Sequence, residues 1–180
     1  MNSIDFLINT LFDLYLMVVI LRIWLQLARA DFYNPFSQFV VKATDPLLRP
    51  LRRVIPGWGG IDNASIVLAF LVAALKMTIL YAVSGAGFPI GQIAFTALMT
   101  LFKETFSIVF WVLIIRAILS WVSQGSYNPI EAVLHQLTEP MLAPIRRIIP
   151  PMGGLDLSIL ILIIGLQFFS LMIGDVMRMI

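Results

Sequence analysis

The sequence predicts an all-α integral membrane protein. Its four transmembrane helices form two parallel repeats, each with a short interfacial amphipathic helix in its cytoplasmic connection. Composition is the first observation: of 180 residues, 60% are hydrophobic and 12% are charged, whereas a soluble domain carries about 25% charged residues. The second is a set of apolar stretches, each long enough to cross a bilayer. The third is a motif of Pro, Gly, Arg and Asp that occurs twice.

Four apolar stretches are predicted membrane spans, since a transmembrane helix needs about 20 residues. They lie at roughly 5–28, 62–83, 92–122 and 156–177. The first has no basic segment before it and no small-residue cleavage site, so we expect it to be retained as a helix rather than removed as a signal peptide. The third is long enough to start in the interface at Lys103 and Glu104.

The repeated motif runs from Tyr-Asn-Pro to an aspartate, at residues 33–62 and again at 127–156. The offset is 94 residues without a gap, and 14 of the 30 aligned positions are identical. Apolar helices resemble one another by composition alone, but a pattern of Pro, Gly, Arg and Asp kept in register does not arise in that way. We therefore expect one membrane domain, 1–180, with repeat one at approximately 1–84 and repeat two at approximately 92–180.

The first part of each motif copy predicts a short amphipathic helix. Asn34-Pro35 and Asn128-Pro129 are typical of an N-cap followed by proline at the first helical position. An apolar stripe with spacing i, i+3, i+4, i+7 follows in both copies: Phe36, Phe39, Val40 and Ala43, then Ile130, Val133, Leu134 and Leu137. About ten residues are too few to span a bilayer. We expect a helix in the interface plane, a helix packed on the protein's own spans, or both.

Prolines are predicted to end this helix in both copies. The residue before a proline is pushed out of the α region, so Thr44-Asp45-Pro46 and Thr138-Glu139-Pro140 should stop it. Pro50 and Pro144 should prevent a long regular continuation.

The arginine pairs that follow have two interpretations, which remain open. They are Arg52, Arg53, Arg146 and Arg147. They can act as topology determinants that contact lipid phosphates, at about 1 kcal/mol per basic residue near an anionic leaflet. Alternatively, they form a docking site for a cytoplasmic partner or an anionic ligand, because the planar guanidinium fork suits phosphate and carboxylate equally well.

Each motif copy ends with two glycines and an aspartate, Asp62 or Asp156. The glycines permit a chain reversal, and the aspartate is well placed to N-cap the incoming span. Arg22 and Arg116 occupy equivalent repeat positions near the cytoplasmic ends of the first and third spans. We expect them to pair with the aspartates, and snorkelling to the interface is the alternative.

Two charges inside the spans break the repeat symmetry. Asp13 lies near the middle of the first span and Lys76 in the second half of the second, where the other copy has Ser107 and Ser170. An ionisable residue there costs roughly 2.5–3.5 kcal/mol on insertion scales and is by default a functional candidate. An Asp13–Lys76 pair between adjacent spans is the simplest structural explanation, and a role in transport is the alternative.

The basic residues predict the topology. We call the segments that hold the two motif copies, between the first and second spans and between the third and fourth, the motif connections. Of the 12 Lys and Arg residues, seven lie in these two motif connections, whereas the connection 84–91 carries none. The positive-inside rule therefore places both motif connections in the cytoplasm and both termini in the periplasm. Because each unit contains two spans, the copies have the same orientation, as in a parallel repeat.

The composition also excludes several functions. The net charge is only +2, so we expect no nucleic-acid partner, which needs a large basic face. The chain has no Cys, which excludes disulfides and thiolate metal sites. It has a single histidine, His135, and no clustered carboxylate pair. We therefore expect no cofactor, no metal and no enzymatic activity.

The second motif copy resembles the signature of the YggT family. The resemblance rests on Arg116-Ala-Ile-Leu-Ser-Trp, Asn128-Pro129-Ile, Thr138-Glu139-Pro140, Pro144-Ile-Arg146-Arg147-Ile-Ile-Pro150 and Gly153-Gly154-Leu-Asp156-Leu-Ser. The first copy departs from it with Phe36 for Ile, Asp45 for Glu, and Asn63-Ala64 where Leu-Ser is usual.

This resemblance implies a small multi-pass protein of the bacterial inner membrane with no attached catalytic mechanism. It also implies a role in tolerance of osmotic or salt stress. A scaffold or assembly factor is the expected function, and an oligomeric ion channel or small-solute transporter is the alternative. Membrane lipids are the expected partners, while a membrane or cytoplasmic protein partner and a homo-oligomer remain open.

Overall fold

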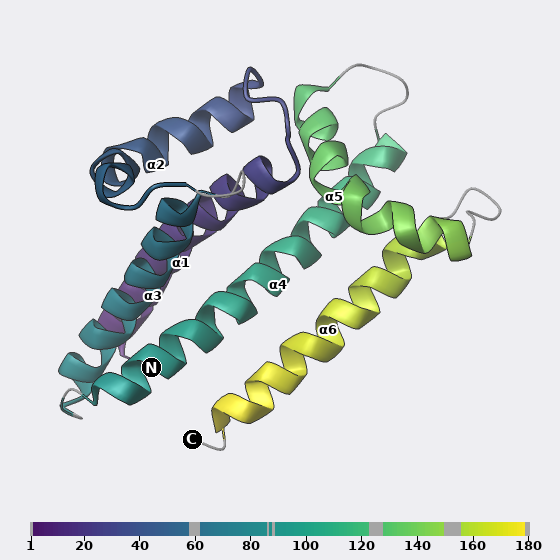
Figure 1. The fold of residues 1–180 in the computed structure, drawn as a ribbon. Coiled ribbons are helices and arrows are strands. Elements are labelled where there is room, and N and C mark those ends of the chain that lie inside the picture. The colour runs from purple at the N-terminus through teal and green to yellow at the C-terminus, as the bar shows by residue number, and fades with distance from the viewer. Residues whose placement is uncertain are drawn as a thin grey trace.

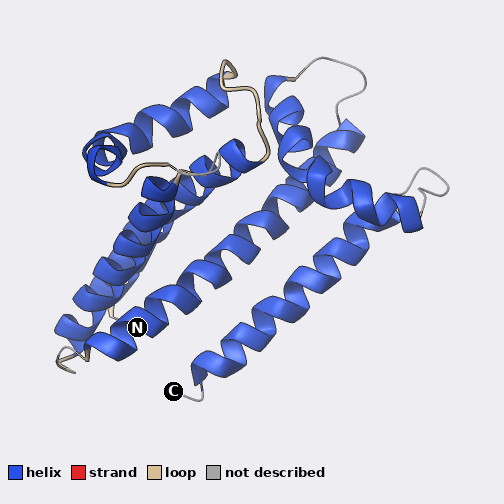
Figure 2. Ribbon diagram, in the orientation of Figure 1, coloured by secondary structure: helices blue, strands red, loops and turns tan. Residues whose placement is uncertain are grey.

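The computed structural model describes residues 2–57, 62–85, 87, 89–122 (backbone only for 120–122), 128–149 and 156–178. These residues form α1 (Ser3–Leu27), α2 (Pro35–Val54), α3 (Asn63–Ser84), α4 (Ile90–Val122), α5 (Pro129–Ile148) and α6 (Leu157–Arg178). Figure 2 shows helices joined by loops and no strand among them. The predicted all-helical fold class is confirmed for this part of the chain.

Four of the helices are long and apolar enough to cross a membrane. They are Ser3–Leu27, Asn63–Ser84, Ile90–Leu119 and Leu157–Arg178. A span needs about 20 residues, and these helices have 25, 22, 30 and 22. They agree with the predicted spans to within a few residues and fit a multi-pass membrane protein.

The long helices run alongside one another, and α2 and α5 lie together at one end of the bundle (Figure 1). The start of α1, the end of α3, the start of α4 and the end of α6 lie at the opposite end. In the first half α1 packs against α2 and α3, and in the second half α4 packs against α5 and α6. The two motif connections therefore share one end of the molecule.

Two pairs of helices have bounds that recur at the offset of the motif. The bounds of α2, 35 and 54, reappear in α5 as 129 and 148, and those of α3, 63 and 84, reappear in α6 as 157 and 178. Each difference is 94 residues, as between the motif copies. The first helices differ, because α4 begins at Ile90 whereas the equivalent of Ser3 is residue 97.

The predicted N-terminus of the motif helix is confirmed in both copies. The side-chain oxygen of Asn34 accepts a hydrogen bond from the Phe36 amide at 2.9 Å, and that of Asn128 accepts one from the Ile130 amide at 3.0 Å. The proline after each asparagine is the first helical residue. Local sequence is sufficient here because the cap, the proline and the first turn are neighbours in the chain.

The predicted stop at the prolines is wrong. Pro46 and Pro50 lie inside α2, and Pro140 and Pro144 lie inside α5. Proline removes one hydrogen bond and displaces a carbonyl, which bends a helix without ending it if the turns on both sides are held by packing. Both helices bend midway in Figure 1. Residues on either side of the prolines are fully buried, namely Val40, Thr44, Leu48, Leu137, Thr138 and Leu142.

The buried core is built from equivalent positions of the two halves. Val19 on α1 and Leu113 on α4 are both fully buried, as are Leu48 on α2 and Leu142 on α5. The glycines predicted to reverse the chain, Gly59-Gly60 and Gly153-Gly154, lie outside the described residues.

Candidate functional site

The same ion pair closes both motif connections. Arg52, in the last turn of α2, donates two hydrogen bonds to Asp62 Oδ2, from Nη2 at 2.5 Å and from Nε at 3.2 Å. Arg146, in the last turn of α5, donates to Asp156 Oδ2 from Nη2 at 2.5 Å and from Nε at 2.9 Å. Each aspartate immediately precedes the next span, so the pair ties the end of the motif helix to the start of that span.

Both aspartates also hold the first turn of the span that follows. Asp156 Oδ1 accepts a hydrogen bond from the Ser158 amide at 3.1 Å, which is the predicted N-cap arrangement. Asp62 makes no such side-chain cap to the backbone of α3. Its Oδ2 atom accepts instead from the hydroxyl of Ser65 at 2.5 Å.

The ion pairs keep these carboxylates charged. Burial acts to raise the pKa of Asp62, but the hydrogen bonds from Arg52 and Ser65 outweigh it and leave the pKa below its usual value. The same balance of burial against Arg146 and Ser158 lowers the pKa of Asp156. The hydrogen bond to Asp62 raises the pKa of Arg52. The net pairing energy therefore exceeds the desolvation that each partly buried carboxylate suffers.

In the second repeat the ion pair extends into a chain of four groups. Arg116 on α4 donates to the hydroxyl of Thr138 and, from Nη2 at 3.1 Å, to Glu139. Glu139 also accepts from Arg146 Nη1 at 2.7 Å, and Arg146 in turn binds Asp156. Alternating positive and negative groups thus connect α4, α5 and the start of α6. Burial acts to raise the pKa of Glu139, but the hydrogen bond from Arg116 and the positive charge of Arg146 outweigh it and leave the pKa below its usual value.

In the first repeat this chain is interrupted. Asp45, the equivalent of Glu139, is one methylene shorter and lies 3.3 Å from Arg49 and 3.9 Å from Arg52. The second copy has Ala143 in place of Arg49. Because the short carboxylate is held by its own helix, it makes no hydrogen bond to Arg22, the equivalent of Arg116.

Arg22 has fewer acceptors than Arg116 among the described residues. It is 8% exposed, and its Nε and Nη1 atoms have no hydrogen-bond partner among the described residues. Its guanidinium carbon lies 5.5 Å from the centre of the Phe32 ring. The expected pairing of Arg22 with Asp62 and of Arg116 with Asp156 is therefore corrected, because Arg52 and Arg146 already hold the two aspartates.

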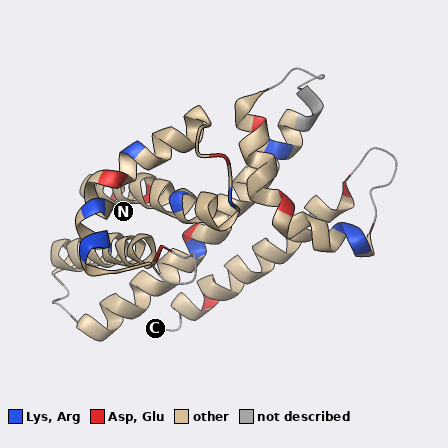
Figure 3. Cartoon of the chain, turned by 45° about the horizontal axis from the view of Figure 1, so that its top comes forward, with Lys and Arg blue, Asp and Glu red and all other residues tan. Residues whose placement is uncertain are grey.

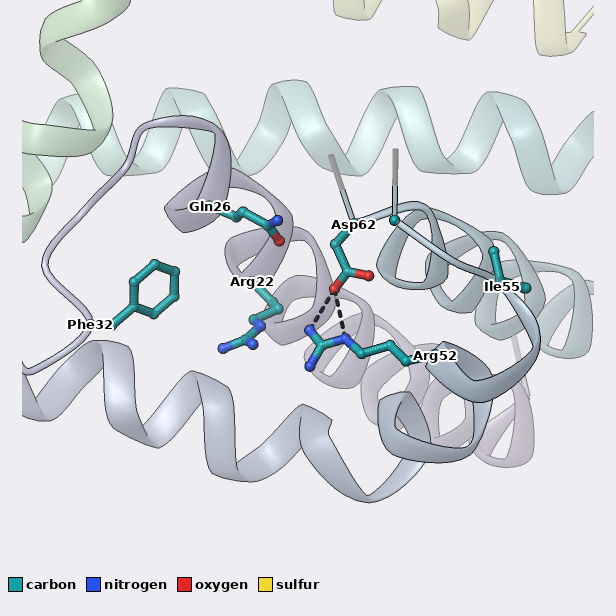
Figure 4. A pocket seen from close by; sticks show the side chains of 7 residues that line it. Arg22, Gln26, Phe32, Arg52, Ile55 and Asp62 are labelled. Carbon is teal, nitrogen blue, oxygen red and sulfur yellow. Dashed lines mark hydrogen bonds and ion pairs between the residues drawn. The ribbon is translucent and has the colours of Figure 1, made fainter. Parts of the chain in front are cut away.

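A cavity of about 650 Å³ opens beside Arg22. In Figure 4 the guanidinium of Arg22 lies between Phe32 on one side and the Arg52–Asp62 ion pair on the other. The remaining lining residues are Gln26, Ile55 and Gly57. The lining carries two positive groups and one negative group, and the negative group is already bound.

The second arginine of each pair has a different environment from the first. Arg53 and Arg147 are exposed, and neither makes a hydrogen bond or ion pair with the described part of the chain. The residue that follows each of them is also highly exposed, Val54 at 79% and Ile148 at 82%. Each pair therefore divides into an inner arginine that binds a carboxylate and an outer arginine without such a partner among the described residues, although Arg52 is itself 37% exposed. Away from α2, α5 and the connections, charged positions are sparse along the long helices (Figure 3).

The two intramembrane charges lie together. Lys76 Nζ on α3 donates to Asp13 Oδ1 on α1 at 2.6 Å. Lys76 is 4% exposed, whereas about a third of the Asp13 side chain is accessible, at 34%. Asp13 and Glu104 both line a second cavity of about 510 Å³, which residues of α1, α2, α4 and α5 enclose. In the part of the chain that the structure describes, no group of His, Cys, Asp and Glu is arranged to hold a metal ion.

Sequence reasoning missed Thr138 and Glu139 as partners of Arg116, and it missed the competition at Asp45. A signal was present, since the acidic residue before proline is preserved as Asp in one copy and Glu in the other. A helix stop needs no acidic residue there, whereas an ion pair does.

Comparison with known proteins gives one family. The chain matches the family described as CCB3/YggT over residues 1–83 and 95–177, two ranges that begin and end 94 residues apart. An uncharacterized protein of Vibrio alginolyticus is 60% identical over 98% of this chain and 96% of its own length. The uncharacterized protein YggT of Escherichia coli K12 is 49% identical over 99% and 93%. An uncharacterized protein of Pseudomonas aeruginosa is 45% identical over 93% and 86%. No solved structure matches.

Proposed function

This chain belongs to the CCB3/YggT family, and from that premise we propose that it is a non-enzymatic scaffold or assembly factor of the bacterial inner membrane. Its role is envelope homeostasis, with a contribution to tolerance of osmotic or salt stress. The two motif connections face the cytoplasm, and the start of α1 and the end of α6 face the periplasm. Each connection presents one surface element to lipid headgroups or to a protein partner.

The observation that carries the proposal is the doubled exposed pair at the ends of α2 and α5. Arg53-Val54 and Arg147-Ile148 occupy equivalent repeat positions, and all four side chains are exposed. An exposed guanidinium beside an exposed aliphatic side chain suits the membrane interface. The cation meets lipid phosphates at about 1 kcal/mol per residue, and the aliphatic group enters the acyl boundary.

The inner arginines support the proposal by a different route. Arg52 and Arg146 fix the ends of α2 and α5 against the spans through Asp62 and Asp156. A surface element fixed in this way is presented in one orientation, which lowers the entropy lost when it binds. Removal of an inner arginine therefore tests the fold, whereas removal of an outer arginine tests the contact.

The test is growth of a bacterial strain that lacks the gene, under salt and osmotic stress, with plasmid-borne variants. We expect the double variant Arg53→Gln/Arg147→Gln to lose tolerance while its amount in the membrane fraction stays at the wild-type level. The charge-retaining variant Arg53→Lys/Arg147→Lys should keep most of it. As a control, Arg49→Gln removes an exposed positive charge from the same helix and should have no effect. Full tolerance in the double Gln variant would refute the proposal.

An oligomeric channel or small-solute transporter is the second candidate. It is favoured by the cavity of about 510 Å³ that Asp13 and Glu104 line among the long helices. The close contact of Asp13 with buried Lys76 counts against it, since the charges neutralise each other. Vesicles that contain the purified protein should show no protein-dependent ion flux under an osmotic gradient. A flux that Asp13→Asn abolishes would establish the transporter instead.

A further inference from the structure

We propose that the cavity beside Arg22 binds a phosphate group, carried either by an anionic lipid headgroup or by a free phosphate ion. The site lies in the first repeat. It goes beyond the proposed scaffold function, because it uses a buried arginine and a cavity instead of the exposed arginines at the ends of α2 and α5.

Arg22 is buried, but two of its guanidinium nitrogens lack an acceptor among the described residues. An arginine is charged at every physiological pH, and burial of a charge without an acceptor is strongly unfavourable. Arg22 is 8% exposed, yet two of its three guanidinium nitrogens have no acceptor in the described part of the chain. The same nitrogens belong to a side chain that lines a cavity of about 650 Å³. Because both nitrogens are closed off from solvent, the guanidinium turns toward the cavity when an acceptor-rich group binds there.

Arg116 occupies the position of the second repeat that is equivalent to Arg22. Arg116 is buried to the same extent, at 8% exposed, but Glu139 and Thr138 supply oxygen acceptors. The environment of this arginine therefore calls for an oxyanion. In the first repeat the protein's own carboxylate, Asp45, accepts from Arg49 through Oδ2, while its buried Oδ1 lies 3.9 Å from Arg52 and has no hydrogen-bond partner among the described residues. A bound ligand would therefore occupy, beside Arg22, the place that Glu139 takes beside Arg116.

The position of the site favours phosphate over carboxylate. Arg22 lies five residues before the end of α1 at Leu27, or about 7.5 Å along the helix at 1.5 Å per residue. That end of the span carries α2 and the motif connections (Figure 1). Lipid phosphates are the abundant oxyanions at the end of a membrane span, and the arginine fork binds them through charge-assisted hydrogen bonds.

The charge and shape of the cavity also suit a phosphate group. Arg22 and Arg52 contribute positive charge, and the negative residue of the described lining, Asp62, is neutralised by Arg52 and accepts a hydrogen bond from Ser65. The ring of Phe32 lies beside the guanidinium of Arg22 and holds it in place (Figure 4). The cavity exceeds many times the ~30 Å³ that one water molecule occupies, so a phosphate group and its substituent fit.

The experiment measures binding to the purified, delipidated full chain in detergent by two arms. The lipid arm uses native mass spectrometry with phosphatidylglycerol, and with diacylglycerol as the phosphate-free control. The ion arm uses calorimetric titration with inorganic phosphate, and with chloride at the same ionic strength. Binding in the lipid arm that free phosphate does not displace identifies a headgroup, and binding in the ion arm identifies the free anion.

Two variants test the assignment to Arg22 and one serves as the matched control. Arg22→Gln should weaken phosphate binding by about tenfold or more, the loss expected for a charged hydrogen bond. Asp45→Glu should weaken it also, because the longer carboxylate can reach Arg22 as Glu139 reaches Arg116. Arg178→Gln, which removes an exposed positive charge from the end of α6, should bind as the wild type does. Because this test changes neither Arg53 nor Arg147, this site and the proposed function can fail separately. Absence of binding in both arms, or binding that Arg22→Gln and Asp45→Glu leave unchanged, would overturn the proposal.

Discussion

The two motif connections begin from nearly the same residues and reach different electrostatic states. In the second repeat, Arg116, Glu139, Arg146 and Asp156 form one chain of alternating charge across three helices. In the first repeat the link between Arg52 and Asp62 remains, the link between Arg52 and Asp45 lengthens to 3.9 Å, and Asp45 makes no hydrogen bond to Arg22. A carboxylate shorter by one methylene and a competing arginine on the same helix account for the difference. The comparison shows that a side chain shorter by one methylene can leave a buried arginine without its carboxylate partner and beside a cavity.

The largest expected effect follows from the number of carboxylates that each inner arginine holds. Arg146 binds Asp156 and Glu139, whereas Arg52 binds Asp62 closely and Asp45 only at 3.9 Å. Arg146→Ala should lower the free energy of unfolding by about 2 kcal/mol, because it leaves two partly buried carboxylates without their cation. Arg52→Ala should cost about half as much. Denaturant titration of both variants in detergent measures the ratio, and equal losses would remove the distinction between the repeats.

A smaller difference is expected at the acidic residue before the proline. Glu139→Gln should destabilise the fold by about 1–2 kcal/mol, since it weakens two arginine contacts at once, one of them to a buried side chain. Asp45→Asn should cost less than about 0.5 kcal/mol, because its partner Arg49 is largely exposed and surface ion pairs contribute little. The same titration provides both numbers. A larger loss for Asp45→Asn would mean that the first repeat depends on Asp45 in a way that its contacts do not explain.

Acid should act on the second repeat more than on the first. The folded-state pKa values of Asp62, Asp156 and Glu139 lie below their usual values, which are about 3.9 for Asp and 4.3 for Glu in the unfolded chain. Their contribution is therefore complete above the unfolded pKa and is lost as the pH falls through the folded pKa. Melting temperatures between about pH 3 and pH 6 should fall toward acid in the wild type. The fall should be shallower in Glu139→Gln, and an unchanged slope would contradict the assignment.

The smallest effect is expected at the outer arginines. Arg53→Gln and Arg147→Gln should change the free energy of unfolding by less than about 0.5 kcal/mol, because both side chains are exposed and make no hydrogen bond or ion pair with the described residues. Unfolding titrations beside those of Arg52→Ala and Arg146→Ala separate the two roles within each pair. A loss as large as that of the inner arginines would show that the division into inner and outer positions is wrong.

The features predicted correctly from the sequence are local ones. The four spans follow from length and apolarity, and the caps at Asn34 and Asn128 follow from residues adjacent in the chain. The proline stop failed because Thr44, Leu48 and their equivalents are buried on both sides of the bend, and burial is a property of the tertiary packing. Sequence patterns could not show which carboxylate each arginine reaches, since that depends on how α1 and α2 approach each other. The Asp45 for Glu139 exchange was visible, but its consequence for Arg22 required the structure.

The most direct test of the account compares Arg22→Gln with Arg116→Gln in the delipidated protein. The two arginines are equivalent in sequence and equally buried. Among the described residues Arg116 donates to Thr138 and Glu139, whereas two guanidinium nitrogens of Arg22 have no acceptor. Arg116→Gln should therefore lower the free energy of unfolding by about 2 kcal/mol, the effect of breaking a charged contact at a partly buried carboxylate. Arg22→Gln should leave the free energy of unfolding unchanged or raise it, because it removes an unpaired buried charge. Equal losses in the two variants would contradict the account.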